Sequence, residues 1–168
     1  MRGFWQVRHP AGHSMNGTGD SLDQERTPED RQKHQSLIEE LVSWLEEQGY
    51  RIDGAEGMEG YAAPLELSND GYGDQEDKAP DISAFDVAQQ QMIIGEAKTG
   101  AEDFESDHAL TQYNVFLDQV HRLSLRRAML FVIVPSGKVA EFNTLITHYL
   151  HPDLWGNIVV VQSRRWES

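Results

Sequence analysis

The chain has 168 residues, of which 39% are hydrophobic and 25% are charged, and it contains no cysteine. This length and composition are typical of one globular domain with its own core, and the lack of cysteine excludes disulfide bonds and a thiolate zinc site. No apolar run approaches the roughly 20 residues of a transmembrane helix, and the first residues lack the apolar core of a signal peptide. We therefore expect a cytoplasmic protein with no membrane partner.

Acidic residues outnumber basic ones by 28 to 14, which gives a formal net charge of −14. A protein that binds DNA phosphates usually carries a basic surface, so this balance needs an explanation if DNA is the partner. Three explanations stay open. The acidic residues are confined to loops such as 70–77, or the protein comes from a high-salt cytoplasm, or it does not bind nucleic acid.

Residues 1–26 are rich in Gly, Ser, Asn, Asp and His and show no hydrophobic periodicity. This predicts a flexible arm ahead of a single domain at residues 27–168. His9 and His13 are metal-ligand types, but an unstructured arm is the preferred interpretation.

The first predicted helix begins at Thr27 and ends at Gly49. Thr27 is a capping residue, Pro28 suits the first helical turn, and glycine favours a helix end. Five apolar residues repeat at helical spacing and form one core stripe: Leu37, Ile38, Leu41, Val42 and Leu45.

A short strand is predicted at residues 50–53, followed by a long segment rich in glycine and acidic residues up to Lys78. The apolar patch 61–67 in that segment predicts a short strand or an ordered turn. The acidic stretch 70–77 lacks the ligand spacing of a calcium-binding EF-hand loop, so a solvated acidic loop is the preferred interpretation.

Residues 79–98 predict a β-hairpin, because two short apolar arms flank the polar break at 87–90. A loop centred on Ala88 and Gln89 pairs Asp86 with Gln91, and the same register places Asp81 opposite Glu96. Side chains alternate along a strand, so Asp81, Glu96 and Lys98 share one face. Two facing carboxylates repel each other, and a bridging divalent cation relieves that repulsion.

Pro80-Asp81, followed by Glu96-Ala97-Lys98, resembles the PD-(D/E)XK motif of restriction-endonuclease-like nucleases. The run Gly95 to Thr99, the acidic residues soon after it and Gln112 on the next helix resemble small resolvase-like members of that superfamily. The resemblance covers roughly residues 28–162. The alternative interpretation is structural: Asp81 and Glu96 are strand-end polar residues in a salt bridge with Lys98.

The resemblance implies a Mg²⁺-dependent nuclease, with Mn²⁺ as a substitute. Asp81, Glu96 and the Ala97 carbonyl would bind the metal, Lys98 would orient the attacking water, and Gln112 would lie near Lys98 and the scissile phosphate. The products would carry a 5′-phosphate and a 3′-hydroxyl. Many nucleases of this type add an acidic residue from the first helix.

The first helix carries Ile38 at the depth where that additional acidic residue is usual. Either Asp30 or His34 replaces it, or the site lacks that ligand. For His34 itself, a partly buried core histidine is the preferred interpretation.

A second helix is predicted at about 104–123, with Gln112 near the rim of its apolar stripe, where a surface glutamine is the alternative. The basic cluster Arg122, Arg126 and Arg127 follows this helix. These arginines either contact nucleic acid or complement the negative end of the helix dipole.

A buried strand at 128–134, a third helix at about 139–150 and a last strand at 157–162 complete the chain. The predicted fold class is α/β, with an αβββαβ core around a central mixed sheet flanked by helices, plus a C-terminal helix and strand.

The sequence therefore predicts a metal-dependent endonuclease that hydrolyses DNA and that forms a homodimer if it cuts two strands. Two alternatives stay open: a catalytically inactive nuclease-fold module for assembly or protein binding, and a hydrolase of small phosphoesters with the same metal dyad. If the facing carboxylates repel each other, Asp81→Asn is expected to stabilise the metal-free protein.

Overall fold

The computed structural model describes residues 26–168, so the predicted arm and its two histidines, His9 and His13, lie outside the described residues except for Arg26. Three α-helices and five strands follow one another as predicted. Their bounds are α1 Pro28–Glu47, β1 Arg51–Ala55, β2 Ile82–Asp86, β3 Gln91–Ala97, α2 Asp107–Leu117, β4 Met129–Val134, α3 Val139–Tyr149 and β5 Ile158–Gln162. The predicted α/β class is confirmed.

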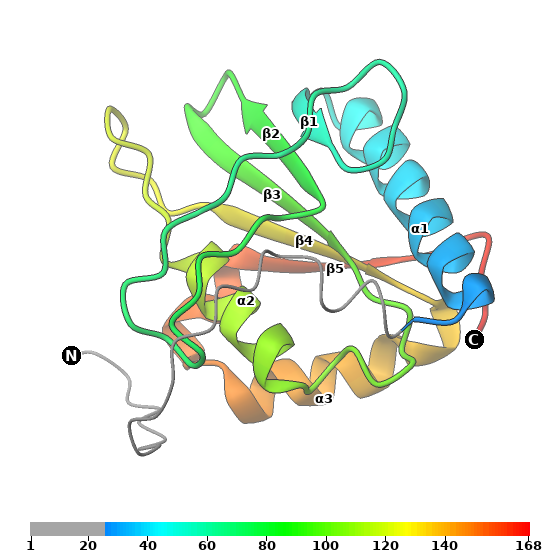
Figure 1. The fold of residues 1–168 in the computed structure, drawn as a ribbon. Helices are drawn as coiled ribbons and strands as arrows, with labels where there is room; N and C mark the ends of the chain where they lie inside the picture. The colour runs from blue at the N-terminus through cyan, green and yellow to red at the C-terminus, as the bar shows by residue number, and fades with distance from the viewer. Residues whose placement is uncertain (1–25) are drawn as a thin grey trace.

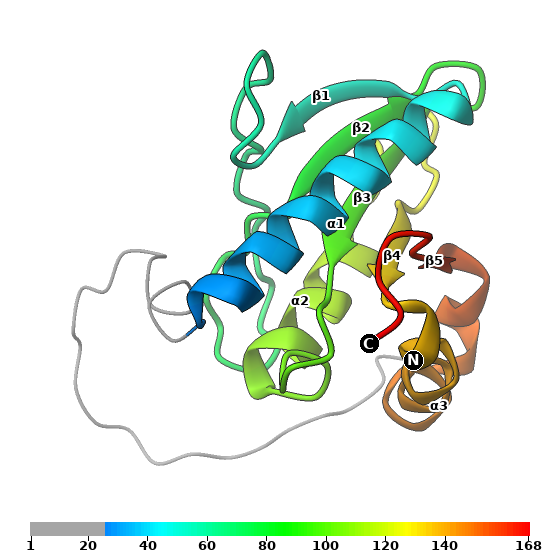
Figure 2. The same cartoon turned by 90° about the vertical axis from the view of Figure 1, so that its right-hand side faces the viewer.

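The five strands form one mixed sheet in the order β1-β2-β3-β4-β5. Strand β2 runs antiparallel to both β1 and β3, whereas β3, β4 and β5 run parallel to one another. Helix α1 covers one face of the sheet, and α2 and α3 cover the other (Figures 1 and 2). Two core clusters result, one under α1 and one under α2 and α3.

Helix α1 has the start and the buried stripe that its sequence predicts. The Thr27 hydroxyl accepts a hydrogen bond from the Asp30 backbone N–H at 3.1 Å, which caps the helix. The five residues of the apolar stripe are all buried against the sheet. Gly49 follows the helix with a φ of 87°, a conformation that glycine adopts without strain.

Gly95 of β3 leaves room for side chains of α1 and β2 to pack directly over β3. A Cβ atom at this position would lie 2.9 Å from Cβ of Ile82 and 3.2 Å from Cδ2 of Leu41, which is closer than side chains normally pack. The absence of a side chain therefore sets the spacing between α1 and the strand that carries Glu96.

The hairpin has the predicted register, in which Asp86 pairs with Gln91 and Ile82 pairs with Gly95. Residues 87–90 form the turn. Ile93 and Ala97 belong to the core under α1, whereas Met92 and Ile94 pack in the core under α2, so the predicted alternation of faces is also present.

Helix α2 is shorter than predicted and ends at Leu117 rather than near residue 123. Arg127 donates a hydrogen bond from Nη1 to the Leu117 carbonyl oxygen, and Val120 pairs with Arg127 in an antiparallel bridge. The chain turns back here to reach β4, so Val120 is 45% exposed and lies outside the core. The patch at 61–67 forms no strand beyond a single bridge between Leu67 and Lys78.

Candidate functional site

The candidate site lies where β2 begins and β3 ends. Asp81 directly precedes β2, and its backbone N–H donates to Oε2 of Glu96 at 3.3 Å. The Ala97 backbone N–H donates to Oδ2 of Asp81 at 2.8 Å. These reciprocal bonds hold the two carboxylates beside each other across the strand ends, and both residues are buried, at 6% and 2% exposure.

Lys98 joins these carboxylates to helix α2. Its ammonium donates to Oε1 of Glu96 at 3.1 Å and to Oε1 of Gln112 at 2.7 Å. Lys98 and Gln112 are both buried, so Gln112 lies inside the molecule rather than at the rim. Ser106 caps α2 by accepting from the Ala109 N–H, which fixes the turn that leads to Gln112.

Helix α1 contributes His34 from the other side of the site. Nε2 of His34 lies 3.2 Å from Oδ2 of Asp81. Asp30, the other residue considered at this place, instead pairs with Arg26 at 3.6 Å. The structure therefore brings together His34, Asp81, Glu96, Lys98 and Gln112, and it leaves Asp30 outside this cluster.

The buried charges of the cluster change one another's pKa values. Burial and the neighbouring charge of Asp81 raise the pKa of Glu96 to about 7, although Lys98 and His34 oppose the rise. Burial also raises the pKa of Asp81, but the charge and hydrogen bond of His34, the Ala97 N–H and Lys98 lower it more, so the net pKa lies well below its usual value. The surroundings therefore favour the protonated form of Glu96 and the ionised form of Asp81.

The same contacts act on His34. Burial lowers the pKa of His34, but the charge and hydrogen bond of Asp81 raise it more, so the net pKa lies above its usual value. The contact with Asp81 thus favours the protonated form of His34.

The donor set suits a hard divalent cation in its chemistry. Two carboxylates repel each other across one strand pair, and carboxylate oxygens are the ligands that Mg²⁺ prefers. Across residues 26–168, however, no group of three His, Asp or Glu side chains is arranged to hold a metal ion. Asp81 and Glu96 therefore supply two carboxylates and no third ligand of these types, so a metal held here would also need an oxygen such as the Ala97 carbonyl that the motif implies.

The predicted basic cluster divides into two kinds of residue. Arg127 is partly buried and bonds the last carbonyl of α2, which is a structural role. Arg122 and Arg126 are exposed in the turn that follows α2, so only these two of the three are available to contact a phosphate.

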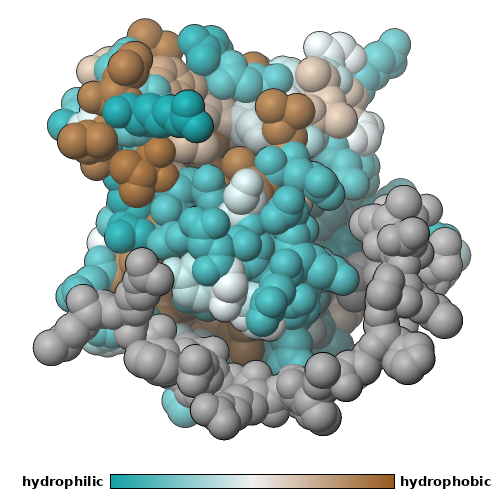
Figure 3. All heavy atoms as spheres, turned by 60° about the vertical axis from the view of Figure 1, so that its left-hand side comes forward, coloured by the Kyte–Doolittle hydropathy of each residue, from teal (hydrophilic) through white to brown (hydrophobic). Residues whose placement is uncertain are grey.

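One face of the molecule is mainly hydrophilic, with apolar residues gathered toward its upper part (Figure 3).

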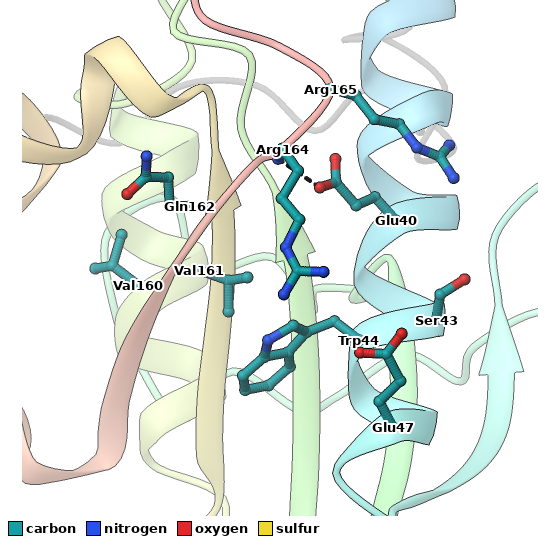
Figure 4. Close-up of a pocket in the computed structure, with 9 residues that line it drawn as sticks. All are labelled: Glu40, Ser43, Trp44, Glu47, Val160, Val161, Gln162, Arg164 and Arg165. Carbon is teal, nitrogen blue, oxygen red and sulfur yellow. Dashed lines mark hydrogen bonds between the residues drawn. The ribbon is translucent and has the colours of Figure 1, made fainter.

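A separate groove of about 410 Å³ lies between α1 and β5. Trp44 and Arg164 lie on facing sides of it, and Glu40 accepts from the Arg164 backbone N–H at 2.6 Å (Figure 4). None of the residues of the carboxylate cluster lines this groove.

Asp74, Lys78 and His108 form a second polar cluster, which the sequence pattern does not predict. The Lys78 ammonium lies 2.7 Å from Oδ2 of Asp74 and 3.2 Å from Nδ1 of His108. His108 and Gln112 are four residues apart on α2, and this spacing was the available signal. The pairing of Lys78 with His108 depends on how the 67–78 loop folds, which no local pattern predicts.

Among the described residues, no helix is both long and apolar enough to cross a bilayer. Comparison with family models, curated proteins and solved structures found no match for this chain.

Proposed function

We propose that this chain is a Mg²⁺-dependent DNA endonuclease of the PD-(D/E)XK type. The observation that supports the proposal is the meeting of Asp81, Glu96 and Lys98 in one buried cluster, with Gln112 bonded to the lysine. Three charged side chains are costly to bury together, and such clusters are frequent at functional sites.

Asp81 and Glu96, together with the Ala97 carbonyl, would hold the cation, which supplies a Lewis acid and a more acidic bound water. Lys98 orients the attacking water and stabilises the negative charge that develops on the phosphate oxygens. Gln112 fixes the lysine through its 2.7 Å hydrogen bond. The water oxygen bonds to phosphorus and releases one proton to the solvent, the bond from phosphorus to the 3′-oxygen breaks, and that oxygen takes up one proton from the solvent.

The test is Mg²⁺- or Mn²⁺-dependent cleavage of supercoiled plasmid and branched DNA by the wild-type protein and by Lys98→Ala. We expect cleavage by the wild type and a loss of at least about 100-fold in the variant, the scale of removing one transition-state donor. Lys138→Ala is the matched control, because Lys138 pairs with Glu141 on the surface. Equal cleavage by Lys98→Ala, or no cleavage by the wild type with either metal, would contradict the proposal.

A second candidate function is a nuclease-fold module without catalysis. Two observations favour it. Both carboxylates are already paired inside the protein, Asp81 with His34 and Glu96 with Lys98. The net charge of −14 also disfavours binding to DNA. The two candidates differ in thermal unfolding with Mn²⁺. A metal site stabilises the folded state by mass action, and Asp81→Asn abolishes that gain, whereas a module without a site shows no gain.

Hydrolysis of a small phosphoester is the remaining outcome of this test. Turnover of a chromogenic phosphodiester that is lost in Lys98→Ala, with DNA left intact, would assign the same residues to a small substrate.

A further inference from the structure

Lys78 is an unusual lysine, because its side chain is only 2% exposed. It lies in the loop ahead of β2, and its ammonium contacts Asp74 at 2.7 Å, Glu76 at 3.6 Å and Nδ1 of His108 at 3.2 Å. A buried ammonium is costly unless its protons are used in hydrogen bonds. This lysine is therefore held in a fixed place, and one of its bonds goes to the ring of His108.

The contact fixes the tautomer of His108. An ammonium group has donors and no acceptor, so Nδ1 must accept the hydrogen bond and carries no proton. The ring is then neutral, and its proton is on Nε2. Oδ2 of Asp74 is 3.8 Å from Nδ1, which is too far for a competing bond.

His108 lies beside the candidate site. It is one turn before Gln112 on α2, and Gln112 bonds Lys98. The His108 side chain is 33% exposed, whereas the Lys98 side chain is 4% exposed. His108 is thus at the accessible side of a row that runs inward through Gln112 and Lys98 to Glu96.

We infer that His108 is a substrate-contacting residue, which donates a hydrogen bond from Nε2 to a phosphate oxygen, and that Lys78 is the residue that positions it. The inference rests on the proposed function for its substrate, which is DNA. The fixed tautomer leaves His108 neither a free lone pair to act as a base nor an easily lost proton to act as an acid. Donation of one neutral hydrogen bond remains.

The surrounding charges keep the ring neutral. Burial, followed by the charges of Lys78 and Lys98, lowers the pKa of His108 to about 4. Asp74 opposes this shift, and Arg26 adds to it. These four groups belong to the loop, to the residue just after β3 and to the start of the described chain, and their net effect together with burial favours the neutral ring at neutral pH.

The first test is ¹⁵N NMR of the histidine rings in the metal-free protein and with added synthetic DNA duplex in Ca²⁺, which limits cleavage. We expect the Nε2–H tautomer for His108 at neutral pH and a shift of its Nε2–H signal when the duplex binds. An Nδ1–H tautomer, or a charged ring at pH 7, would overturn the inference without any reference to catalysis.

The second test measures duplex affinity of three variants. His108→Ala should weaken binding about 3- to 10-fold, the scale of one hydrogen bond, and His108→Gln should restore most of it, because its amide N–H replaces Nε2–H. Lys78→Met should remove the hydrogen bond that fixes the tautomer, so that the His108 ring signals no longer show the Nε2–H form alone and duplex affinity falls toward that of His108→Ala. If Lys78→Met does not fold, the affinity of His108→Ala and the ring signals of the wild type still test whether His108 contacts the duplex.

The outcomes separate this inference from the proposed function. If the duplex binds while the ring signal stays fixed and His108→Ala binds equally well, the inference fails and the nuclease proposal stands. If inorganic phosphate shifts the ring signal but no duplex binds, the phosphate contact stands and the DNA proposal fails. If neither probe binds, both fail.

Discussion

At the scale of single residues, Asp81 and Glu96 differ in how their charges are balanced. Asp81 accepts from the Ala97 N–H and lies against His34, whereas Glu96 is bonded to Lys98 and lies next to the charge of Asp81. The pKa of Asp81 is lowered and that of Glu96 is raised to about 7. One carboxylate is therefore stabilised as an anion, and the other is stabilised in its protonated form.

This difference predicts opposite effects for two neutralising substitutions. At pH 8, Glu96→Gln should stabilise the metal-free protein by on the order of 2 kcal/mol, since it removes a charge whose folded-state pKa is raised. Asp81→Asn should destabilise it, because the partner of His34 is lost. The hairpin register alone predicts a gain from Asp81→Asn, and the contact with His34 reverses that expectation. Thermal unfolding in EDTA measures both, and a gain for Asp81→Asn would contradict this account.

The pH dependence follows from the same pKa values. The folded-state pKa values of Glu96 and His34 are raised, so the folded protein binds more protons than the unfolded chain, and stability is lost as the pH rises between about 4.5 and 8. The lowered pKa of Asp81 acts in the other direction: its contribution is present above about pH 4 and is lost as the pH falls further. Unfolding midpoints across this range should show a maximum in mildly acidic buffer.

Matched variants show which residues cause the loss of stability toward pH 8. Glu96→Gln and His34→Gln should each flatten the decline toward pH 8, whereas His148→Gln, on the surface helix α3, should leave it unchanged. A wild-type midpoint that rises steadily to pH 8 would be inconsistent with the raised pKa values.

At the scale of elements, the arginines after α2 differ in role, because Arg127 bonds the end of the helix and Arg126 is exposed. Arg127→Gln removes the donor to the Leu117 carbonyl and should destabilise the protein by about 1–2 kcal/mol. Arg126→Gln, one residue away and exposed, should change stability by less than about 0.5 kcal/mol. Urea unfolding of the two variants provides the comparison, and equal losses would show that the α2 end does not depend on Arg127.

The elements that the sequence predicted well are those with local signals. Helix α1 has its cap at Thr27 and its apolar stripe within one segment, and the period-two pattern of the hairpin fixes its register. The end of α2 was placed too late because it depends on Arg127, ten residues farther along the chain. Lys78 and His108 were missed for a similar reason, since their loop and helix meet only in the folded molecule.

At the scale of the whole molecule, the net charge of −14 acts on stability as well as on partners. Like charges on one surface repel and destabilise the compact state, and salt screens them. We expect the unfolding midpoint to rise by several degrees between about 0.05 and 1 M NaCl, where the Debye length falls below 10 Å. Glu66→Gln with Asp70→Asn, two exposed acids, should reduce this salt response. A midpoint that is independent of salt would mean that the acidic residues do not repel appreciably.

Gly95 links the distance between α1 and the sheet to the contact between His34 and Asp81. Because Cβ and Cδ1 of Ile82 and the Cδ2 methyl of Leu41 fill the space above it, any larger residue there would push α1 away from the sheet. Helix α1 would then move outward, and His34 would lose its contact with Asp81 although no charged residue had been changed. A single hydrogen atom in place of a side chain thus sets how far His34 can reach.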